Sequence, residues 1–173
     1  MMGLAVVLGE DSSPNETFIQ VASRGFLITT TQLRSAMFAS SSLHLSFCRY
    51  AHDFLIHTSR TALVNSRAKI EERLARWLLL VHDRTDENTL NLTHEFLSTM
   101  LGVRRPGVTL ALHMLEYRGL IRAKRSEIVI IDRDGLVALT QGLYGPEEQR
   151  HFQKIQADRS IANTPVQAGE VLR

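Results

Sequence analysis

The fold of this chain is decided by one stretch, LTHEFLSTMLGVRRPGVTLALHMLE, which runs from Leu92 to Glu116. Its spacing predicts two short helices joined by a tight turn. Thr93 can cap the first helix, because its hydroxyl can accept from an orphan backbone N–H. Gly102 sits where that helix must stop, since glycine adopts a left-handed turn conformation at little steric cost. Pro106 suits the first turn of a second helix, where a missing N–H breaks no hydrogen bond.

The side chains of the second helix divide into a buried stripe and an exposed set. The buried stripe is expected to hold Val108, Leu112 and Leu115. The exposed set holds Arg104, Arg105, Thr109 and His113. A helix, a glycine turn and a basic helix start form the helix-turn-helix pattern, whose second helix enters the major groove of DNA. From spacing alone, the alternative is an ordinary helical hairpin.

A strand hairpin is predicted directly after the second helix. Residues 119–122 look like the start of a strand, residues 124–127 are a polar turn, and residues 128–131 are a β-branched apolar run. A hairpin at this place is a wing. From residue 104 to 125 the basic residues are opposed only by Glu116, whereas a solvated charged face usually mixes signs. This bias favours a surface that faces phosphates.

Several motifs of this region together resemble the DNA-binding domain of the Crp/Fnr family of bacterial transcription regulators. They are Thr93-His94-Glu95-Phe96-Leu97, the run 100–109 (MLGVRRPGVT), Leu115-Glu116, Gly119-Leu120-Ile121 and the run 132–136 (DRDGL). The resemblance is close over residues 73–145 and looser back to Met1. It implies an N-terminal jelly-roll sensor domain, a long dimerising helix and a C-terminal winged helix-turn-helix.

The predicted fold is therefore α+β and mostly helical. We expect a truncated, cyclic-nucleotide-binding-like sensor domain over residues 1–40, which is a partial β jelly roll, and a dimerisation helix over 41–65. A winged helix-turn-helix domain is expected over 66–145, and a mobile C-terminal tail over 146–173.

Composition narrows the possible chemistry. The chain has 173 residues and is 44% hydrophobic, enough for one domain or two small ones. Its net charge is only +2, with a pI of about 9.0, so a nucleic-acid hypothesis depends on where the charges lie. The single cysteine, Cys48, excludes an intrachain disulfide framework and a cysteine-ligated zinc or iron–sulfur site, and no cofactor is expected.

The sequence shows neither a transmembrane segment nor a signal peptide. No apolar run approaches the roughly 18 residues that a transmembrane helix needs. The start, Met1-Met2-Gly3-Leu4, lacks the layout of a signal peptide. We therefore expect a cytoplasmic protein without a membrane partner.

The N-terminal segment is predicted to form strands and turns. Residues 4–8 are a short apolar run, residues 17–21 and 25–29 read as strands, and residues 31–38 read as a short helix. So few strands cannot close a sandwich or barrel, and they leave sheet edges unpaired. Compared with the family, the chain begins near the last third of the sensor jelly roll. We expect either a truncated gene or a true start that lies upstream.

Cyclic-nucleotide binding is not predicted. Members of the family that bind these ligands carry an Arg-Ser pair, and the arginine pairs with the phosphate. Ser12-Ser13-Pro14 occupies that region here, and it offers no arginine. No effector is assigned.

Residues 41–65 contain neither proline nor glycine and are predicted to form one long helix. Alternating spacings of four and three connect Leu43, Phe47, Tyr50, Phe54, His57, Thr61 and Val64. A heptad pattern over this length indicates helix–helix pairing, and the family resemblance implies that the pairing makes a dimer. The candidate interface residues are Phe47, Tyr50, Phe54 and Thr61. The alternative is a helix packed on the core of its own domain.

Asn65 and Ser66 prefer helix caps to helix interiors, so they are predicted to break or bend this helix. A second helix should span residues 67–82, with Trp77 in its buried stripe and Arg76 on its wet side. Residues 90–92 alternate like a short strand. A last helix is expected over residues 135–143, with a cap among residues 132–134.

An enzyme is not predicted. His94-Glu95 begins like the zinc-protease motif HExxH, but Ser98 stands where the second histidine is required. One histidine and one glutamate cannot close a three-ligand zinc site. The sequence also contains no nucleophile elbow, P-loop or dinucleotide-binding glycine motif.

Two functions remain. The first is a homodimeric transcription regulator that binds a palindromic operator through its recognition helix, with double-stranded DNA and RNA polymerase as partners. The second is a helical interaction module that lacks its sensor and forms inactive heterodimers with a full-length relative. The intact basic motif favours the first.

The resemblance assigns roles to individual side chains. The predicted base contacts are Arg104, Arg105 and Thr109. The predicted phosphate contacts are Thr93, His113, Lys124 and Arg125. Pro106 replaces a glutamate of the cyclic-AMP-dependent members, and Leu110 replaces a later helix arginine, so the operator should differ from theirs.

Overall fold

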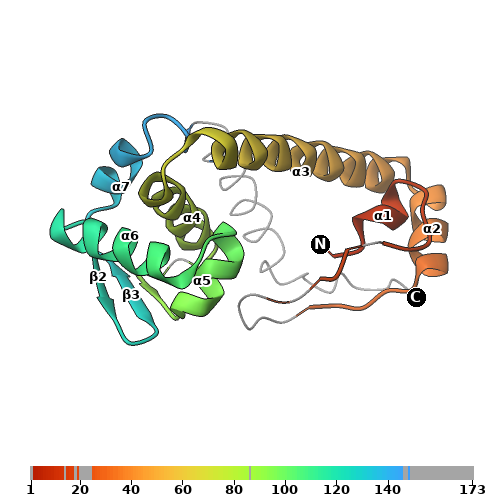
Figure 1. Cartoon of the computed structure of the whole chain (residues 1–173). Coiled ribbons are helices and arrows are strands. Elements are labelled where there is room, and N and C mark those ends of the chain that lie inside the picture. The colour runs from red at the N-terminus through yellow and green to blue at the C-terminus, as the bar shows by residue number, and fades with distance from the viewer. Residues whose placement is uncertain are drawn as a thin grey trace, which may run out of the picture. The chain divides into compact units, whose positions relative to one another are not determined.

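The structure is a computed structural model that describes residues 2–13, 15–17, 19, 25–85, 87–145 and 148 (Figure 1). The helices of these residues are α1 (Leu4–Val7), α2 (Thr30–Ala39), α3 (Ser41–Arg67), α4 (Ile70–Thr85), α5 (His94–Leu101), α6 (Arg105–Tyr117) and α7 (Arg133–Leu139). The strands are β1 (Thr89–Leu90), β2 (Ile121–Lys124) and β3 (Glu127–Ile130). The chain divides into two compact units, 1–60 and 61–173, and is mostly helical with a small sheet, as predicted.

The first unit is helical where strands were predicted. Residues 4–7 form α1, because an apolar run this short suits either conformation and here it packs on α2 through Val7, Leu33 and Met37. Residues 25–29 have no strand pairing, and of the strand predicted at 17–21 only residues 17 and 19 are described, neither of them in a strand. The described part of residues 1–40 thus holds no strand of the expected jelly roll. Its assignment to a sensor domain stays a prediction.

Helix α2 confirms the helix predicted at residues 31–38. It begins after a capping box, in which Gln32 N–H donates to Thr29 Oγ1 over 3.2 Å and Gln32 Oε1 accepts from Thr29 N–H over 3.1 Å. These two bonds satisfy donors that the first helical turn leaves unpaired. The local sequence therefore explains where α2 starts.

Helix α3 continues through Asn65 and Ser66, where a break or a bend was predicted. Ser66 Oγ donates to the Leu63 carbonyl over 2.8 Å, which satisfies the hydroxyl inside the helix. The interruption comes at residues 68–69 instead, and Glu72 accepts from Lys69 N–H over 3.0 Å just before α4. The helix therefore ends at Arg67, beyond the predicted end at residue 65, because a serine can bond back to its own helix.

The second unit packs α4 to α7 and a three-stranded antiparallel sheet, in the order β1-β3-β2, around one core. The largest fully buried side chains are Leu74, Leu78, Leu79, Leu97, Leu112, Leu115, Ile128, Leu136, Val108 and Thr140. Trp77 lies against this core and meets Phe96 edge-on, with the ring centroids 5.8 Å apart. This confirms the core position predicted for Trp77.

Arg76 was predicted on the wet side of α4 and is buried instead. Its Nε donates to the Leu143 carbonyl over 3.0 Å, and its NH2 lies 3.3 Å from Glu148 Oε1. A buried guanidinium needs such partners, and they come from beyond α7. Glu148 is itself buried, so this residue of the predicted mobile tail is held against α4. Residues 149–173 lie outside the described residues.

Helix α7 begins earlier and is shorter than predicted. Asp132 caps it by accepting from Gly135 N–H over 2.8 Å. A Cβ at Gly135 would collide with the Asp132 side chain and with Leu120, so a larger residue there would require these side chains to shift. None of the helices in the described part of the chain is long and apolar enough to cross a membrane.

The acidic side chain of Asp83, on α4, binds one residue at the start of α7 and one residue beyond its end. Asp83 Oδ1 accepts from Arg133 over 2.7 Å, and Asp83 Oδ2 accepts from the Tyr144 hydroxyl over 2.6 Å. Arg133 also donates to the Tyr144 oxygen over 2.9 Å. This triangle of side chains attaches the C-terminal part of the domain to α4.

Candidate nucleic-acid interface

The turn between α5 and α6 has the geometry that the sequence predicts. Thr93 Oγ1 accepts from Phe96 N–H over 3.1 Å and so caps α5. Gly102 ends that helix with φ 61°, in the left-handed region. Arg104 is the residue before α6, and Pro106 lies in the first turn of α6, where no N–H is needed. Residues 94–117 are therefore a helix-turn-helix.

Helix α6 presents three kinds of surface. Its buried side holds Val108, Ala111, Leu112 and Leu115. Its polar side holds Arg105, Thr109, His113 and Glu116. A third side is apolar and exposed, and it includes Leu110 and Tyr117. The first two sides agree with the pattern read from the sequence.

The wing is the hairpin of β2 and β3, which lies beside α6 (Figure 1). Its strands pair Ile121 with Ile130 and Lys124 with Glu127, and the turn passes through Ser126 with φ 61°. The Ser126 carbonyl accepts from Leu92 N–H over 3.0 Å, just before α5. The tip of the wing is thus attached to the beginning of the helix-turn-helix.

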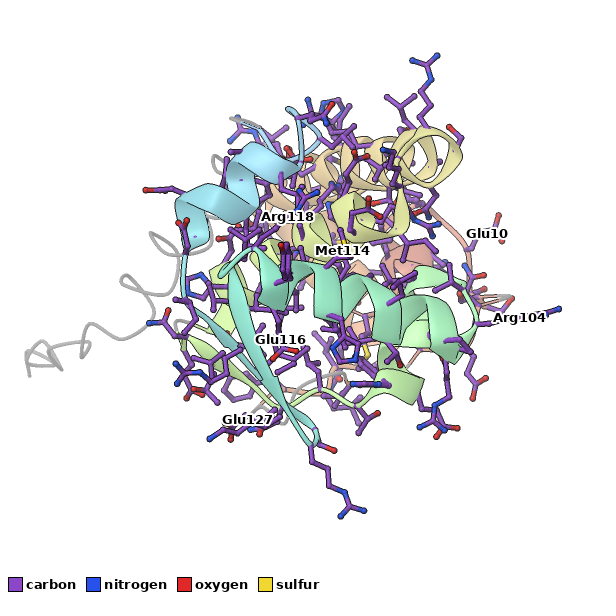
Figure 2. All side chains as sticks on the ribbon, turned by 60° about the vertical axis from the view of Figure 1, so that its left-hand side comes forward. Glu10, Arg104, Met114, Glu116, Arg118 and Glu127 are labelled. Atoms are coloured by element: carbon purple, nitrogen blue, oxygen red, sulfur yellow. The ribbon has the colours of Figure 1, made fainter. Side chains whose placement is uncertain are left out.

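An open hollow of about 520 Å³ lies between α5, α6 and the wing. It is lined by Thr93, His94, Glu95, Arg105, Thr109, Leu112, His113, Glu116, Ala123, Lys124, Arg125 and Ser126. Every predicted DNA contact except Arg104 is among these residues. Arg104 is exposed at the N-terminal end of α6 and points outward there (Figure 2).

The cations of the hollow lie on opposite sides of it. Arg105 comes from α6, whereas Lys124 and Arg125 come from the wing, and all three are exposed. Two carboxylates, Glu95 and Glu116, are also present. In the described part of the chain, no group of three His, Cys, Asp or Glu side chains could hold a metal ion. An anion that bridges the hollow would meet a cation at each side.

Glu116 connects the recognition helix to the wing. Its Oε1 accepts from Ala123 N–H over 2.6 Å, and its Oε2 lies 3.6 Å from His113 Nδ1. Figure 2 shows the side chain directed from α6 toward the wing. In the sequence, Glu116 is the one acidic residue between positions 104 and 125, and nothing in its spacing reveals a backbone partner on β2.

Thr109 uses its hydroxyl inside the protein. The oxygen lies 3.2 Å from the Arg105 carbonyl, to which it donates, and 3.1 Å from His94 Nδ1. The contact with His94 connects α6 to α5, and both bonds leave the γ-methyl group for other contacts. The base contact assigned to Thr109 stays a prediction, and an apolar contact suits it best.

The candidate dimer residues lie along α3. Phe54 is 47% exposed, while Phe47, Tyr50 and Thr61 are partly buried. Further exposed apolar side chains on this helix are Leu45, Leu55, Ile56 and Leu63. Cys48 is exposed as well. Helix α3 thus carries much apolar surface that is exposed in the described part of the chain.

Comparison with known proteins identifies the domain. Residues 72–139 match the family model of the Crp-like helix-turn-helix domain. No curated protein matches the chain. A transcriptional regulator of the Crp/Fnr family from Eubacterium rectale has a TM-score of 0.54 and 22% identity, over 66% of this chain and 53% of its own. A CRP-family transcriptional regulator from Thermus thermophilus has a TM-score of 0.53 and 17% identity, over 61% of this chain and 57% of its own.

At these identities the two structures show a shared fold. The chain spans little more than half the length of either one. The family model covers α4 to α7 and the wing, the elements that form the hollow and its support.

Proposed function

We propose that this chain, which belongs to the Crp/Fnr family through its helix-turn-helix domain, is a transcription regulator that binds double-stranded DNA. In this proposal α6 enters the major groove and the wing lies along the sugar–phosphate backbone. Base edges are then within reach of Arg104 and Arg105 at the start of α6, where recognition helices make their base contacts.

The hollow between α5, α6 and the wing is the observation that carries this proposal. It gathers three exposed cations with the capped N-terminus of α5, and each of these groups favours a phosphate. The bond from Phe96 uses the Thr93 oxygen as an acceptor and leaves its hydrogen to donate to a phosphate. An interaction module that formed only heterodimers would need none of these groups.

The proposal includes a homodimer that binds a palindrome. One recognition helix covers few base pairs, whereas two copies related by a two-fold axis reach successive major grooves, about 34 Å apart. The apolar side chains exposed on α3 support this assembly, because pairing two such helices would bury them. RNA polymerase is a further proposed partner, on the family resemblance alone.

Binding measurements with the full chain test the proposal. Duplexes selected from a random-sequence library should bind far more tightly than scrambled duplexes of the same length, at one defined salt concentration. Arg105→Ala should weaken binding to the selected duplexes more than binding to the scrambled duplexes. The matched control is Arg67→Ala, since Arg67 is an exposed arginine at the end of α3 and does not line the hollow. If the wild-type chain binds all duplexes alike, the proposal is wrong.

A further inference from the structure

The outward side of α6 carries an apolar stripe that none of the contacts above uses. Leu110 is 65% exposed, Met114 is 36% exposed and Tyr117 is 90% exposed. At about 100° of turn per residue, Leu110 points away from the side where Val108 and Leu112 are buried. Nothing in the core therefore requires a leucine at this position.

Cations surround the stripe. Arg104 and Arg105 lie at the N-terminal end of α6, and Arg118 follows its C-terminal end, exposed (Figure 2). Lys124 and Arg125 lie across the hollow from the same helix. Charged residues are depleted at the centre of protein–protein interfaces, so this setting suits a polyanion better than a protein partner.

The floor of the major groove offers one apolar group to such a surface. Each thymine projects a C5-methyl there, whereas the other base edges present hydrogen-bond donors and acceptors. A leucine side chain can make no hydrogen bond, so the favourable contact that it can make with a base edge in the groove is with this methyl group.

We propose that Leu110 reads the C5-methyl of a thymine in each half of the operator. The inference rests on the proposed function and specifies it further. Five residues separate Leu110 from Arg105, which is about 7.5 Å along the helix and on the order of two base-pair steps. The thymine should therefore lie within about three base pairs of the base that Arg105 contacts.

The experiment uses the full chain and a duplex selected by the wild type from a random-sequence library. Each thymine in one half-site is replaced in turn by deoxyuridine, which removes only the methyl group. One replacement should raise the wild-type Kd about fourfold. This is the change in affinity expected when the burial of one methyl group is lost. In the Leu110→Ala variant the same replacement should change the Kd by less than about 1.5-fold, because the methyl is no longer covered.

Met114→Ala is the matched control, since Met114 lies one turn further along the stripe and should leave the fourfold effect intact. Leu110 is exposed, so Leu110→Ala should keep the wild-type melting temperature. A selected duplex without any such thymine, or a fourfold effect that persists in Leu110→Ala, overturns the inference and leaves the proposed function standing. The latter outcome would favour a protein partner for the stripe. Failure to select any duplex overturns both.

Discussion

Arg105 is the first residue of α6, and its exposed side chain lines the hollow. An arginine that donates to both O6 and N7 of a guanine contributes about 1–3 kcal/mol of discrimination. Arg105→Ala should therefore reduce the difference in Kd between cognate and scrambled duplexes by about that amount, measured by fluorescence anisotropy. Equal weakening on both duplexes would make Arg105 a phosphate contact instead.

Tyr144 makes the stability of the domain depend on pH. Burial and the hydrogen bond to Asp83 raise the pKa of Tyr144 to about 12. The pKa of Arg133 is also raised: burial lowers it, but the bonds to Asp83 and Tyr144 outweigh that effect. Because the folded pKa of Tyr144 exceeds the value of about 10 in an unfolded chain, its contribution is complete below pH 10 and is lost toward pH 12.

The free energy of unfolding should therefore fall by on the order of 2 kcal/mol between about pH 10 and pH 12, beyond the loss from other groups. Urea unfolding of the wild type and of Tyr144→Phe isolates this effect, since the variant lacks the titrating hydroxyl. The variant should be less stable at pH 8 and should show a shallower decline. Parallel profiles would mean that Tyr144 does not titrate in this way.

At the scale of secondary-structure elements, the wing is proposed to contact the DNA backbone. Removing the charge of Lys124 should lower affinity similarly on all sequences and reduce the salt slope by about one unit. Arg122→Ala is the matched control, because Arg122 is exposed on the same strand but does not line the hollow. An unchanged slope for Lys124→Ala would place the wing away from DNA.

The position of the wing should depend on Glu116. Its carboxylate accepts from Ala123 N–H, and a hydrogen bond to a charged group contributes about 1.5 kcal/mol or more. Glu116→Ala should therefore speed hydrogen exchange of the Ala123 amide about tenfold. Glu116→Gln keeps an acceptor and should retain most of the protection. Equal exchange in both variants would contradict this role.

At the scale of the whole molecule, DNA binding should require dimerisation through α3. Phe54→Glu would place a charge where two helices are proposed to meet, and a buried unpaired charge is strongly unfavourable. The variant should sediment as a monomer and lose operator binding. Phe54 is 47% exposed in the single chain, so the monomeric variant should keep the helical circular-dichroism signal of the wild type.

Ser59→Glu serves as the control for this test, because Ser59 is exposed on the same helix but outside the heptad stripe. Sedimentation over a range of concentrations separates a specific dimer from aggregation through exposed apolar surface. A wild-type chain that stays monomeric at tens of micromolar, yet binds a palindrome tightly, would contradict the dimer.

The amino-acid sequence by itself determined the helix-turn-helix and the wing. Their signals are local: Thr93 caps a helix three residues from its partner, Gly102 adopts a left-handed turn, and apolar side chains recur at helical spacing. The positions of most predicted DNA contacts follow from these signals, because a helix face is set by residue spacing alone.

Only the tertiary structure decided the contacts between distant residues. Arg76 and Glu148 are 72 positions apart, and Asp83 and Tyr144 are 61 apart, so no local period relates them. The helical form of residues 4–7 was likewise decided by packing on α2, since four apolar residues suit a strand equally well. Glu116 binds the wing because folding brings the free edge of β2 against α6. Such partners meet only when the chain is compact, and the secondary-structure propensities of the residues carry no information about which distant residues will meet.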